Sequence, residues 1–513
     1  MSSLPDRILS RPHLLLLPAL KLAIHAATLP GYGIFRDELY YVACAKRLAW
    51  GYVDHPPLSI ALLGLVRGIF GESLAALRSV PALAGAATLL ILGLLVERLG
   101  GGRWAQVLAM GAALVAPYFL AVGHFYSMNA LDLLIWTSVG YLMVDLAQRP
   151  RLSRWLVLGA VLGGGLLNKI SVLWLGAGLF LGLLGTEHRR LLLTRGPWLA
   201  AGLSLLLFAP HLAWQKAQGW PTLEFIANAT GRKMVPVSPA DFVAGQVDLL
   251  GGWLIFAFAL AGLGSLLLGR ATGRLLAIAY LAVFAILILS GSSRPGYLGP
   301  ATTWLLAGGG VALEAAARRI SRPRWRGAFL ALALTLLGLQ GAVAAPFALP
   351  ILPVESFIRY ARSLGVEPST SERKELAQLP QFFADMHGWR LKAEAAHRVA
   401  DSLPDADRER ACFFARNYGV AGALEYFAPS GSPPVLSGHN SYWLWGPGPC
   451  TGEVILAMGG EAEDYAGLFE QVEPAVTVDC GYCMPYENHQ TLFILRGPRG
   501  SLEETWPRLK HFD

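Results

Sequence analysis

The sequence predicts an α-helical polytopic membrane protein that carries a small α/β domain at its C-terminal end. Of its 513 residues, 54% are hydrophobic and only 15% are charged, whereas a soluble protein carries about 25% charged residues. Apolar runs of about 20 residues, the length that crosses a bilayer, recur through the first two-thirds of the chain. From about Val354 onward, charged and polar residues return at the density of a soluble protein.

The apolar runs predict about eleven membrane spans, and we expect the transmembrane domain to cover residues 1–345. The expected spans are 12–30, 79–96, 104–122, 128–146, 155–167, 171–185, 197–213, 249–268, 275–291, 298–317 and 327–345. We interpret the first as an uncleaved span and not as a signal peptide, because no clear small-residue cleavage site follows it. The runs at 155–167 and 171–185 are short enough to form one bent hairpin around Asn168 and Lys169.

Basic residues predict the orientation of these spans. The formal net charge is +7, and the arginines lie in short clusters between apolar runs, as in cytoplasmic loops, so nucleic acid is not an expected partner. This pattern places the N-terminus in the cytoplasm, and an odd number of spans then places residues 346–513 in the periplasm. Loop 31–78 and the polar segments near 123–127, 168–169, 215–248 and 292–297 fall on that outer face, so we expect a single site there.

Loop 31–78 contains two expected interfacial helices, near 37–50 and 59–70, and two groups of candidate site residues. Asp37 and Glu38 follow the first span, and one carboxylate there could take a proton from a hydroxyl group. The alternative is a salt bridge with Arg36. Asp54 and His55 precede two prolines that stiffen the turn, so this segment either joins two helices or directs His55 at a phosphate or an acceptor group.

Two cations stand at the outer ends of later spans. Lys169 lies between two short apolar runs, and Arg294 precedes the tenth span, close to Tyr297. Either cation could hold a phosphate and offset the negative charge that develops on it. The alternative is that both anchor the chain to lipid headgroups.

A further polar cluster lies where the third and fourth spans meet. It contains His124, Tyr126 and Asn129, and Asp132 follows one turn further into the span. Because an acid inside a span rarely faces lipid, we expect Asp132 to pair with a cation across the bundle.

The tail predicts buried strands at 411–415, 454–457 and 491–495 and a helix at 417–427. It contains no phosphate-binding glycine motif, so we predict no nucleotide site. Four of the five cysteines lie in this domain, and the outer compartment favours structural disulfides among them over redox catalysis. The pairing is left open among Cys412, Cys450, Cys480 and Cys483.

Three motifs together resemble the N-terminal signature of membrane glycosyltransferases of families 39 and 83. They are Arg36-Asp37-Glu38-Leu39-Tyr40-Tyr41, Gly51-Tyr52-Val53-Asp54-His55-Pro56-Pro57-Leu58 and Arg78-Ser79-Val80-Pro81-Ala82-Leu83-Ala84-Gly85. These families include protein O-mannosyltransferases and bacterial transferases that add aminoarabinose or galacturonic acid to lipid A. The resemblance covers roughly residues 12–320 and implies the GT-C fold, with an active site on the outer face.

The resemblance also implies roles for individual residues. Asp37 would be the catalytic base with Glu38 beside it, and Asn168-Lys169 looks like a Thr-Lys or Asn-Lys pair of the family. Arg294, Tyr297 and Pro300 look like its Lys-x-x-Tyr-x-x-Pro element, with arginine in place of lysine. The chain departs from many lipid A transferases at His55-Pro56, where they have Lys-Pro, and near Asn129, where they have aspartate.

We therefore expect an enzyme that transfers a hexose or pentose, with inversion, from a polyprenyl-phosphate carrier at the outer face of a bacterial inner membrane. Its expected partners are that donor, a lipid A, glycan or protein acceptor, and membrane lipid. No cofactor is certain, a divalent cation is left open, and metal ligands are unknown. The alternatives are a transporter or lipid flippase without glycosyl transfer, and a non-catalytic receptor. The predicted substrate-binding residues are Asp54, His55, Tyr126, Asn129, Lys169, Arg294 and Tyr297.

Overall fold

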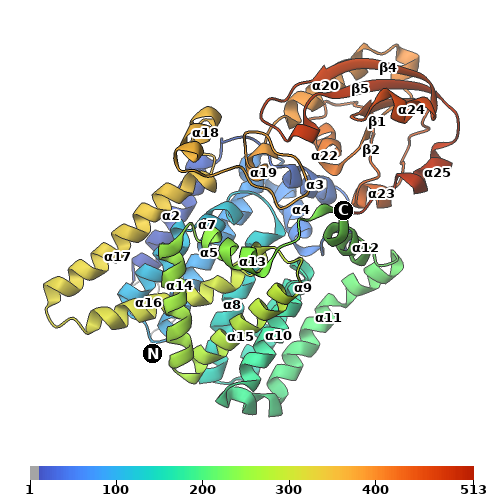
Figure 1. The fold of residues 1–513 in the computed structure, drawn as a ribbon. Helices are drawn as coiled ribbons and strands as arrows, with labels where there is room; N and C mark the ends of the chain where they lie inside the picture. Colours follow the sequence, from blue (N-terminus) through green and yellow to red (C-terminus); the bar gives the residue numbers. More distant parts are fainter. Residues whose placement is uncertain (1–10) are drawn as a thin grey trace. The chain divides into compact units, whose positions relative to one another are not determined.

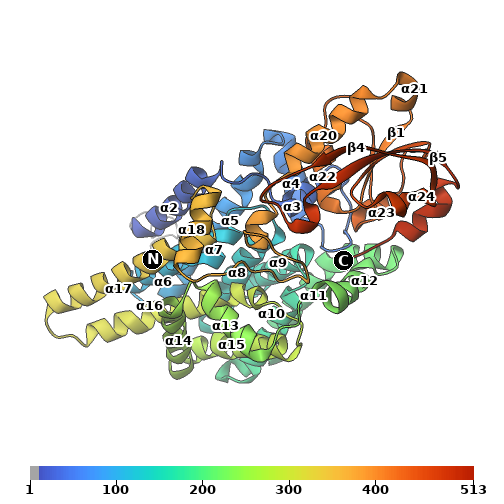
Figure 2. The same cartoon turned by 45° about the horizontal axis from the view of Figure 1, so that its top comes forward.

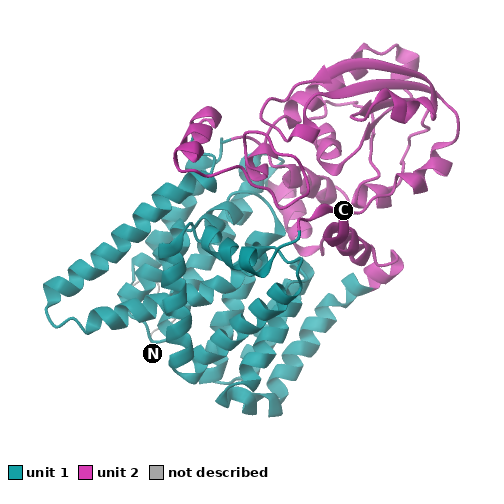
Figure 3. Cartoon of the chain, in the orientation of Figure 1, with its two compact units in different colours: residues 1–31, 70–212, 236–352 teal, residues 32–69, 213–235, 353–513 magenta. Residues whose placement is uncertain are grey.

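The computed structural model describes residues 11–513 and divides the chain into two compact units (Figures 1 and 3). Unit 1 comprises residues 1–31, 70–212 and 236–352, and unit 2 comprises residues 32–69, 213–235 and 353–513. Most of loop 31–78 therefore belongs to the same unit as the tail domain. The predicted cytoplasmic N-terminus lies outside the described residues.

Unit 1 is a bundle of helices, and a helix occupies every expected span. The span expected at 104–122 is two helices, because Pro117 begins a new helix and supplies no N–H to continue the first one. The expected hairpin around Asn168 and Lys169 is present as two helices. The helices are α2 (His13–Thr28), α5 (Leu74–Arg98), α6 (Arg103–Val115), α7 (Pro117–Val122), α8 (Met128–Gln148), α9 (Leu152–Asn168), α10 (Val172–Leu184), α11 (Arg195–Ala217), α13 (Pro239–Leu249), α14 (Trp253–Leu268), α15 (Ala271–Leu289), α16 (Thr302–Arg318) and α17 (Pro323–Ala344).

The described helices support a multi-pass membrane protein by length and composition. Five are long and apolar enough to cross a membrane, and α13 with α14, bent by 105°, makes a sixth if the pair is one span. Several further helices are apolar but shorter, so the count of eleven spans is not confirmed. The most apolar 18-residue stretch of α5 is 72% buried, whereas that of the segment Pro323–Phe347, which contains α17, is only 22% buried. Helix α5 therefore lies in the centre of the bundle and α17 at its edge.

Small residues allow the helices of unit 1 to approach closely. A Cβ atom at Gly262 of α14 would overlap the backbone oxygen of Leu305 on α16, and one at Gly309 would lie 2.6 Å from the oxygen of Phe258. Helix interfaces in membranes depend on such contacts, because lipid supplies no hydrophobic force between helices. The α14–α16 interface therefore depends on glycine.

Unit 2 is built around a five-stranded sheet of order β2-β1-β3-β5-β4. Strands β2, β1 and β3 run parallel to one another, and β5 pairs antiparallel with both β3 and β4. The three predicted strands are confirmed as β1, β3 and β5, and the predicted helix as α22. The strands are β1 (Ala411–Ala415), β2 (Val435–Leu436), β3 (Val454–Met458), β4 (Phe469–Val478) and β5 (Gln490–Pro498). Sequence reasoning missed β4, because this edge strand is mostly exposed and has no buried apolar run.

Helices cover both faces of this sheet (Figure 2). Phe413 of β1 packs against His397 of α20 (Trp389–Ser402). Its neighbour Cys412 belongs to a core that includes Tyr465 of α24 (Ala462–Ala466). Successive strand residues point to opposite faces, so α20 and α24 lie on opposite sides. The other helices of unit 2 include α3 (Arg36–Ala45), α4 (Leu58–Phe70), α12 (Pro221–Asn228), α18 (Val354–Ser363), α19 (Gln381–Ala384), α22 (Tyr418–Tyr426) and α23 (Ser441–Trp445).

Two disulfides staple the tail domain, as expected for structural cysteines. Cys412 pairs with Cys450, and Cys480 pairs with Cys483. Cys44 is a free, buried thiol. The helices α3 and α4 also confirm the two short helices expected in the first outer loop.

The close approach of α14 and α16 can be tested with two glycines of one helix. Gly262→Ala should lower the free energy of unfolding by about 1–3 kcal/mol, because the added methyl group meets backbone that cannot rotate away. Gly264→Ala is the matched control, since nothing lies within 4 Å of a Cβ atom there. Thermal unfolding of both variants in detergent measures the difference, and equal melting temperatures would contradict the packing described.

Candidate functional site

Asp37 occupies the first turn of α3, and the start of this helix determines which acid is accessible. The backbone N–H of Phe35 donates to Glu38 Oε2 at 2.9 Å, and Glu38 is fully buried. Asp37 points elsewhere, since successive helical residues are about 100° apart, and its side chain is 36% exposed. Glu38 thus caps the helix, and Asp37 presents a carboxylate to the surroundings.

Helix α22 of the tail domain positions Asp37. The hydroxyl of Tyr418 donates to Asp37 Oδ1 at 2.9 Å. The two helices approach closely because α22 carries glycine at the contact: a Cβ atom at Gly422 would lie 2.9 Å from the backbone carbon of Leu39. The segment from Asn417 to Ala423 is therefore a packing surface for α3.

Arg36 lies at the centre of a buried charge network. Its guanidinium nitrogens lie 3.6 Å from Asp37, 3.5 Å from Glu372 and 3.5 Å from Asp385, and Nη1 donates to the hydroxyl of Tyr486 at 2.8 Å. The predicted Arg36–Asp37 salt bridge exists, but Asp37 shares the cation with two more deeply buried acids. Because the cation is shared, Asp37 is held in place without being fully neutralised.

Asp385 differs from the other acids of this network. Burial raises its pKa to about 7; Arg36 opposes the rise, and the negative charges of Asp37, Glu372 and Glu487 add to it. Near neutral pH, Asp385 is therefore a mixture of acid and carboxylate.

Glu487 is compensated separately within the same region. It forms a buried ion pair with Lys392 and accepts a hydrogen bond from Asn417 Nδ2 at 2.7 Å. The same Asn417 also caps α22, because its Oδ1 accepts from the backbone N–H of Val420. The charge network is thus tied to the helix that holds Asp37.

The second signature motif contacts the tail domain through α3 and α23. The hydroxyl of Tyr40 lies 3.0 Å from Asp54 Oδ1 and 2.7 Å from Ser441 Oγ. Ser441 also accepts from the backbone N–H of Val53 at 3.1 Å. His55 packs against the rings of Tyr40, Tyr41 and Tyr52 with no exposed side-chain surface. In this arrangement His55 supports the turn, and its contact with a substrate stays a prediction.

Unit 1 contains a second cluster, centred on Lys169 at the break between α9 and α10. Its ammonium group donates to Asn129 Oδ1 at 2.8 Å and lies 3.6 Å from Asp132 Oδ2. Asp132 is buried and also accepts from Ser171 Oγ and Trp136 Nε1. The expected pairing of Asp132 with a cation across the bundle is confirmed.

Of the other predicted residues of unit 1, Tyr297 lies at this break. The ring of Tyr297 lies 5.2 Å from Lys169 Nζ and packs on Trp174. Arg294 immediately precedes the short 3-10 helix Pro295–Tyr297 and is partly buried, and Tyr126 is buried. Lys169, Asn129 and Tyr297 are therefore brought together, and substrate contacts by all of these residues stay predictions.

Residues 11–513 contain one group of three side chains that could hold a metal ion: His439, His511 and Asp513. His439 Nδ1 accepts from the backbone N–H of Tyr418, so its Nε2 carries the proton toward Asp513. Both ring nitrogens of His511 lie close to carbonyl oxygens, at 3.0 and 3.1 Å. His439 thus has no free lone pair for a metal, because one ring nitrogen accepts a hydrogen bond and the other carries a proton. The hydrogen bond from His439 lowers the pKa of Asp513.

The tail domain also carries a groove of about 400 Å³ lined by prolines, aromatic rings and charges. Arg47 forms two hydrogen bonds to Glu425, at 2.7 and 3.0 Å, and its guanidinium carbon lies 4.4 Å from the centre of the Trp445 ring. Tyr442 packs against the same tryptophan. The aromatic faces can stack on a sugar ring, and the charged groups beside them can hydrogen-bond its hydroxyl groups.

Comparisons with known proteins agree with this architecture. The sequence profile described as dolichyl-phosphate-mannose-protein mannosyltransferase matches residues 54–214. ArnT from Cupriavidus metallidurans, in a crystal structure bound to undecaprenyl phosphate, aligns with a TM-score of 0.62 at 16% identity, over 94% of this chain and 99% of that chain. This is the GT-C glycosyltransferase fold.

Two further solved structures align with this chain less closely. The Archaeoglobus fulgidus oligosaccharyltransferase in its apo form has a TM-score of 0.50 at 14% identity, over 82% of this chain and 64% of that chain. The arabinofuranosyltransferase AftD from Mycobacteria also has a TM-score of 0.50 at 14% identity, over 95% of this chain and 42% of that chain. No curated protein sequence matches the chain significantly.

Sequence reasoning missed Tyr418, Asp385 and Ser441, the tail residues that contact Asp37, Arg36 and Tyr40. Tyr418 and Ser441 stand in two glycine-bearing segments, 417–423 and 437–443. Nothing in the sequence indicated that these segments face the first outer loop, because their contacts join residues nearly 400 positions apart. The two segments could be noticed by their glycine content, but the sequence did not show which part of the chain they contact.

The raised pKa of Asp385 predicts a pH-dependent stability. The ordinary pKa of an aspartate is 3.8, so the folded state binds the proton of Asp385 more tightly than the unfolded state does. This difference adds at most about 4 kcal/mol to the free energy of unfolding. The gain is complete below about pH 4 and is lost as the pH rises to about 7. Asp385→Asn stays neutral, so its melting temperature should fall less between pH 4 and 7.5 than that of the wild type. Glu463→Gln, at an exposed acid, is the control, and a wild-type pH profile in Asp385→Asn would contradict the assignment.

Proposed function

We propose that this chain transfers a sugar from a polyprenyl-phosphate carrier to an acceptor at the outer face of a bacterial inner membrane. The observation that carries the proposal is Asp37, a partly exposed carboxylate held by Tyr418 and Arg36 at the start of α3. The GT-C fold and the mannosyltransferase profile support glycosyl transfer. The undecaprenyl phosphate in the ArnT crystal structure supports a polyprenyl carrier.

The proposed reaction is a single displacement with inversion. Asp37 accepts the proton of an acceptor hydroxyl while the oxygen of that hydroxyl attacks the anomeric carbon of the sugar. The bond between that carbon and the phosphate oxygen breaks, and the carrier leaves as polyprenyl phosphate. Tyr418 keeps the carboxylate oriented through the reaction, and Glu38 fixes the helix start on which this orientation depends.

Lys169 is the proposed contact for the leaving phosphate. An ammonium group has three donors; Asn129 accepts from one of them, and the carboxylate of Asp132 lies 3.6 Å from the nitrogen. A remaining donor can meet a phosphate oxygen as negative charge develops there, which stabilises the transition state. We assign the same role to Arg294, with Tyr297 bordering the site. The acceptor is a lipid A, glycan or protein hydroxyl.

The transporter or flippase hypothesis requires no proton acceptor at Asp37. A chain of that kind would tolerate loss of this carboxylate as long as the helices stay packed. Substitution of Asp37 therefore discriminates between the two functions.

Asp37→Asn should reduce transfer by about 10²–10⁴-fold, because the amide cannot accept the proton. The measurement is mass spectrometry of lipid A and envelope glycans from a deletion strain that expresses each variant, with membrane levels of the protein checked. Tyr418→Phe should lose about tenfold, since it keeps the base but not the hydrogen bond. Asp401→Asn, at an exposed acid of the tail domain, is the control. Full transfer by Asp37→Asn would sink the enzymatic proposal.

Lys169→Met should reduce transfer by about 10²-fold, through loss of a donor that faces the developing charge. The loss should appear in kcat more than in KM when polyprenyl-phosphate pentoses and hexoses are supplied to vesicles. Lys216→Met, at an exposed lysine of α11, should be unaffected. If both lysine variants behave alike, Lys169 does not contact the phosphate.

A further inference from the structure

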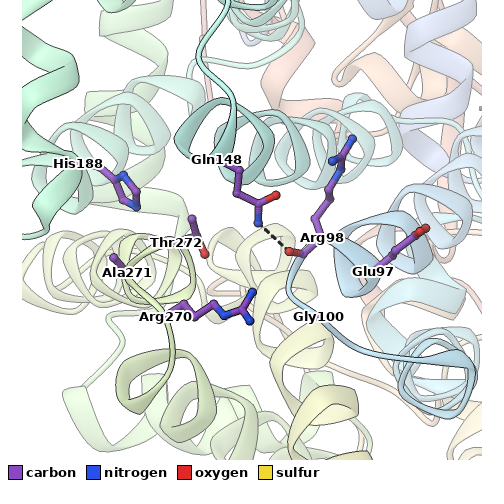
Figure 4. Close-up of a pocket in the computed structure, with 8 residues that line it drawn as sticks. All are labelled: Glu97, Arg98, Gly100, Gln148, His188, Arg270, Ala271 and Thr272. Atoms are coloured by element: carbon purple, nitrogen blue, oxygen red, sulfur yellow. Dashed lines mark hydrogen bonds between the residues drawn. The ribbon is translucent and has the colours of Figure 1, made fainter. Parts of the chain in front are cut away.

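Besides the groove in the tail domain, unit 1 contains a polar cavity of about 430 Å³ (Figure 4). Its lining includes none of the residues discussed above. It lies where the ends of several helices meet. Its lining comes from the end of α5, the end of α8, the 3-10 helix Glu187–Leu193 and the start of α15: Glu97, Arg98, Gly100, Gln148, His188, Arg270, Ala271 and Thr272. These segments are basic loops that the charge pattern assigns to the cytoplasmic side.

The cavity contains donors for which the described chain supplies no acceptor. Thr272 is 9% exposed, and its hydroxyl makes no hydrogen bond to any residue in 11–513. Within the same range, no acid pairs with the Arg270 guanidinium, and His188 Nε2 is buried without a hydrogen-bond partner. Figure 4 shows the Arg270 guanidinium and the Thr272 hydroxyl turned toward the same space.

The start of α15 adds further positive character. This 19-residue helix has no side-chain cap at Arg270 and no acid in its first turn. The first N–H groups of a helix have no partner within it, and the helix dipole places partial positive charge there. An anion is the ligand that such a helix end accepts.

Two of the acids near the cavity are already paired, whereas Glu187, beside His188, is exposed. Glu97 forms a salt bridge with Arg11 at 2.9 Å, and Asp145 forms salt bridges with Arg98, at 2.8 Å, and with Arg154. Figure 4 shows the Glu97 carboxylate turned away from Arg270. Arg270 is therefore a lining cation that neither of these two acids pairs with, and a ligand oxygen can accept hydrogen bonds from it and from Thr272.

We propose that this cavity binds the phosphate of an anionic phospholipid headgroup. Arg270 pairs with the phosphate, while Thr272 and the first N–H groups of α15 donate to its oxygens. A lipid is favoured over a soluble phosphate because Leu193 and Leu268, close in sequence to His188 and Arg270, are 89% and 90% exposed. Such leucines on a membrane protein are surfaces for acyl chains, and basic pockets at cytoplasmic helix ends bind anionic headgroups.

The test uses the full-length protein in detergent and three probes: phosphatidylglycerol, phosphatidylcholine and inorganic phosphate. Native mass spectrometry and thermal stabilisation measure binding of each. The wild type should bind phosphatidylglycerol at least tenfold more tightly than phosphatidylcholine. Arg270→Gln should lose about tenfold of that affinity, and Thr272→Val should lose a smaller part.

Arg274→Gln is the matched control, since Arg274 lies in the same first turn, hydrogen-bonds the oxygen of Gly269 and does not line the cavity. It should bind phosphatidylglycerol as the wild type does. Equal binding of the two lipids, or an unchanged preference in both Arg270→Gln and Thr272→Val, would overturn the proposal. Saturation of the cavity by millimolar inorganic phosphate, with no added effect of phosphatidylglycerol, would overturn the assignment to lipid.

Discussion

The buried guanidinium of Arg36 is the constraint on which unit 2 depends. A charge removed from water is tolerated only when partners surround it, and here they come from segments far apart in the chain: Asp37 beside it, Glu372 and Asp385 after the last membrane helix, and Tyr486 before the last strand. Each of these segments must be folded for the cation to be satisfied. The network therefore makes the geometry around Asp37 a property of the whole unit and not of the first outer loop alone.

Unit 1 applies the same principle at Lys169, with a simpler arrangement. Asp132 is anchored by Ser171 and Trp136 before it meets the ammonium group, so the acid has little freedom to follow the cation. In both clusters a fully buried group holds a partly accessible one. This division keeps the accessible group, Asp37 or Lys169, rigid, as the proposed roles of the two side chains in preorganised catalysis require.

The sequence could predict the features that repeat locally. Apolar runs located every helix of the expected spans, and short buried runs located β1, β3 and β5. The exposed strand β4 lacked such a run, and the break at Pro117 was hidden inside an apolar stretch. At the candidate site, the spacing of Asp37, Asp54 and Lys169 drew attention to them, whereas Tyr418 could not be found. Its role depends on a glycine contact with α3 that no local pattern reveals, because the partner lies in another part of the chain.

The tail domain is best understood as part of the candidate active unit. It looks like a soluble module in composition, yet its segments 417–423 and 437–443 supply Tyr418 to Asp37 and Ser441 to Tyr40 and Val53. Gly422 is required at the first contact because a side chain would meet the backbone of Leu39. Without these contacts, residues 32–69 would expose Arg36 and the tyrosines around His55 to water. The signature motif and the tail domain thus stabilise each other, and a change at their interface acts on the carboxylate through its support.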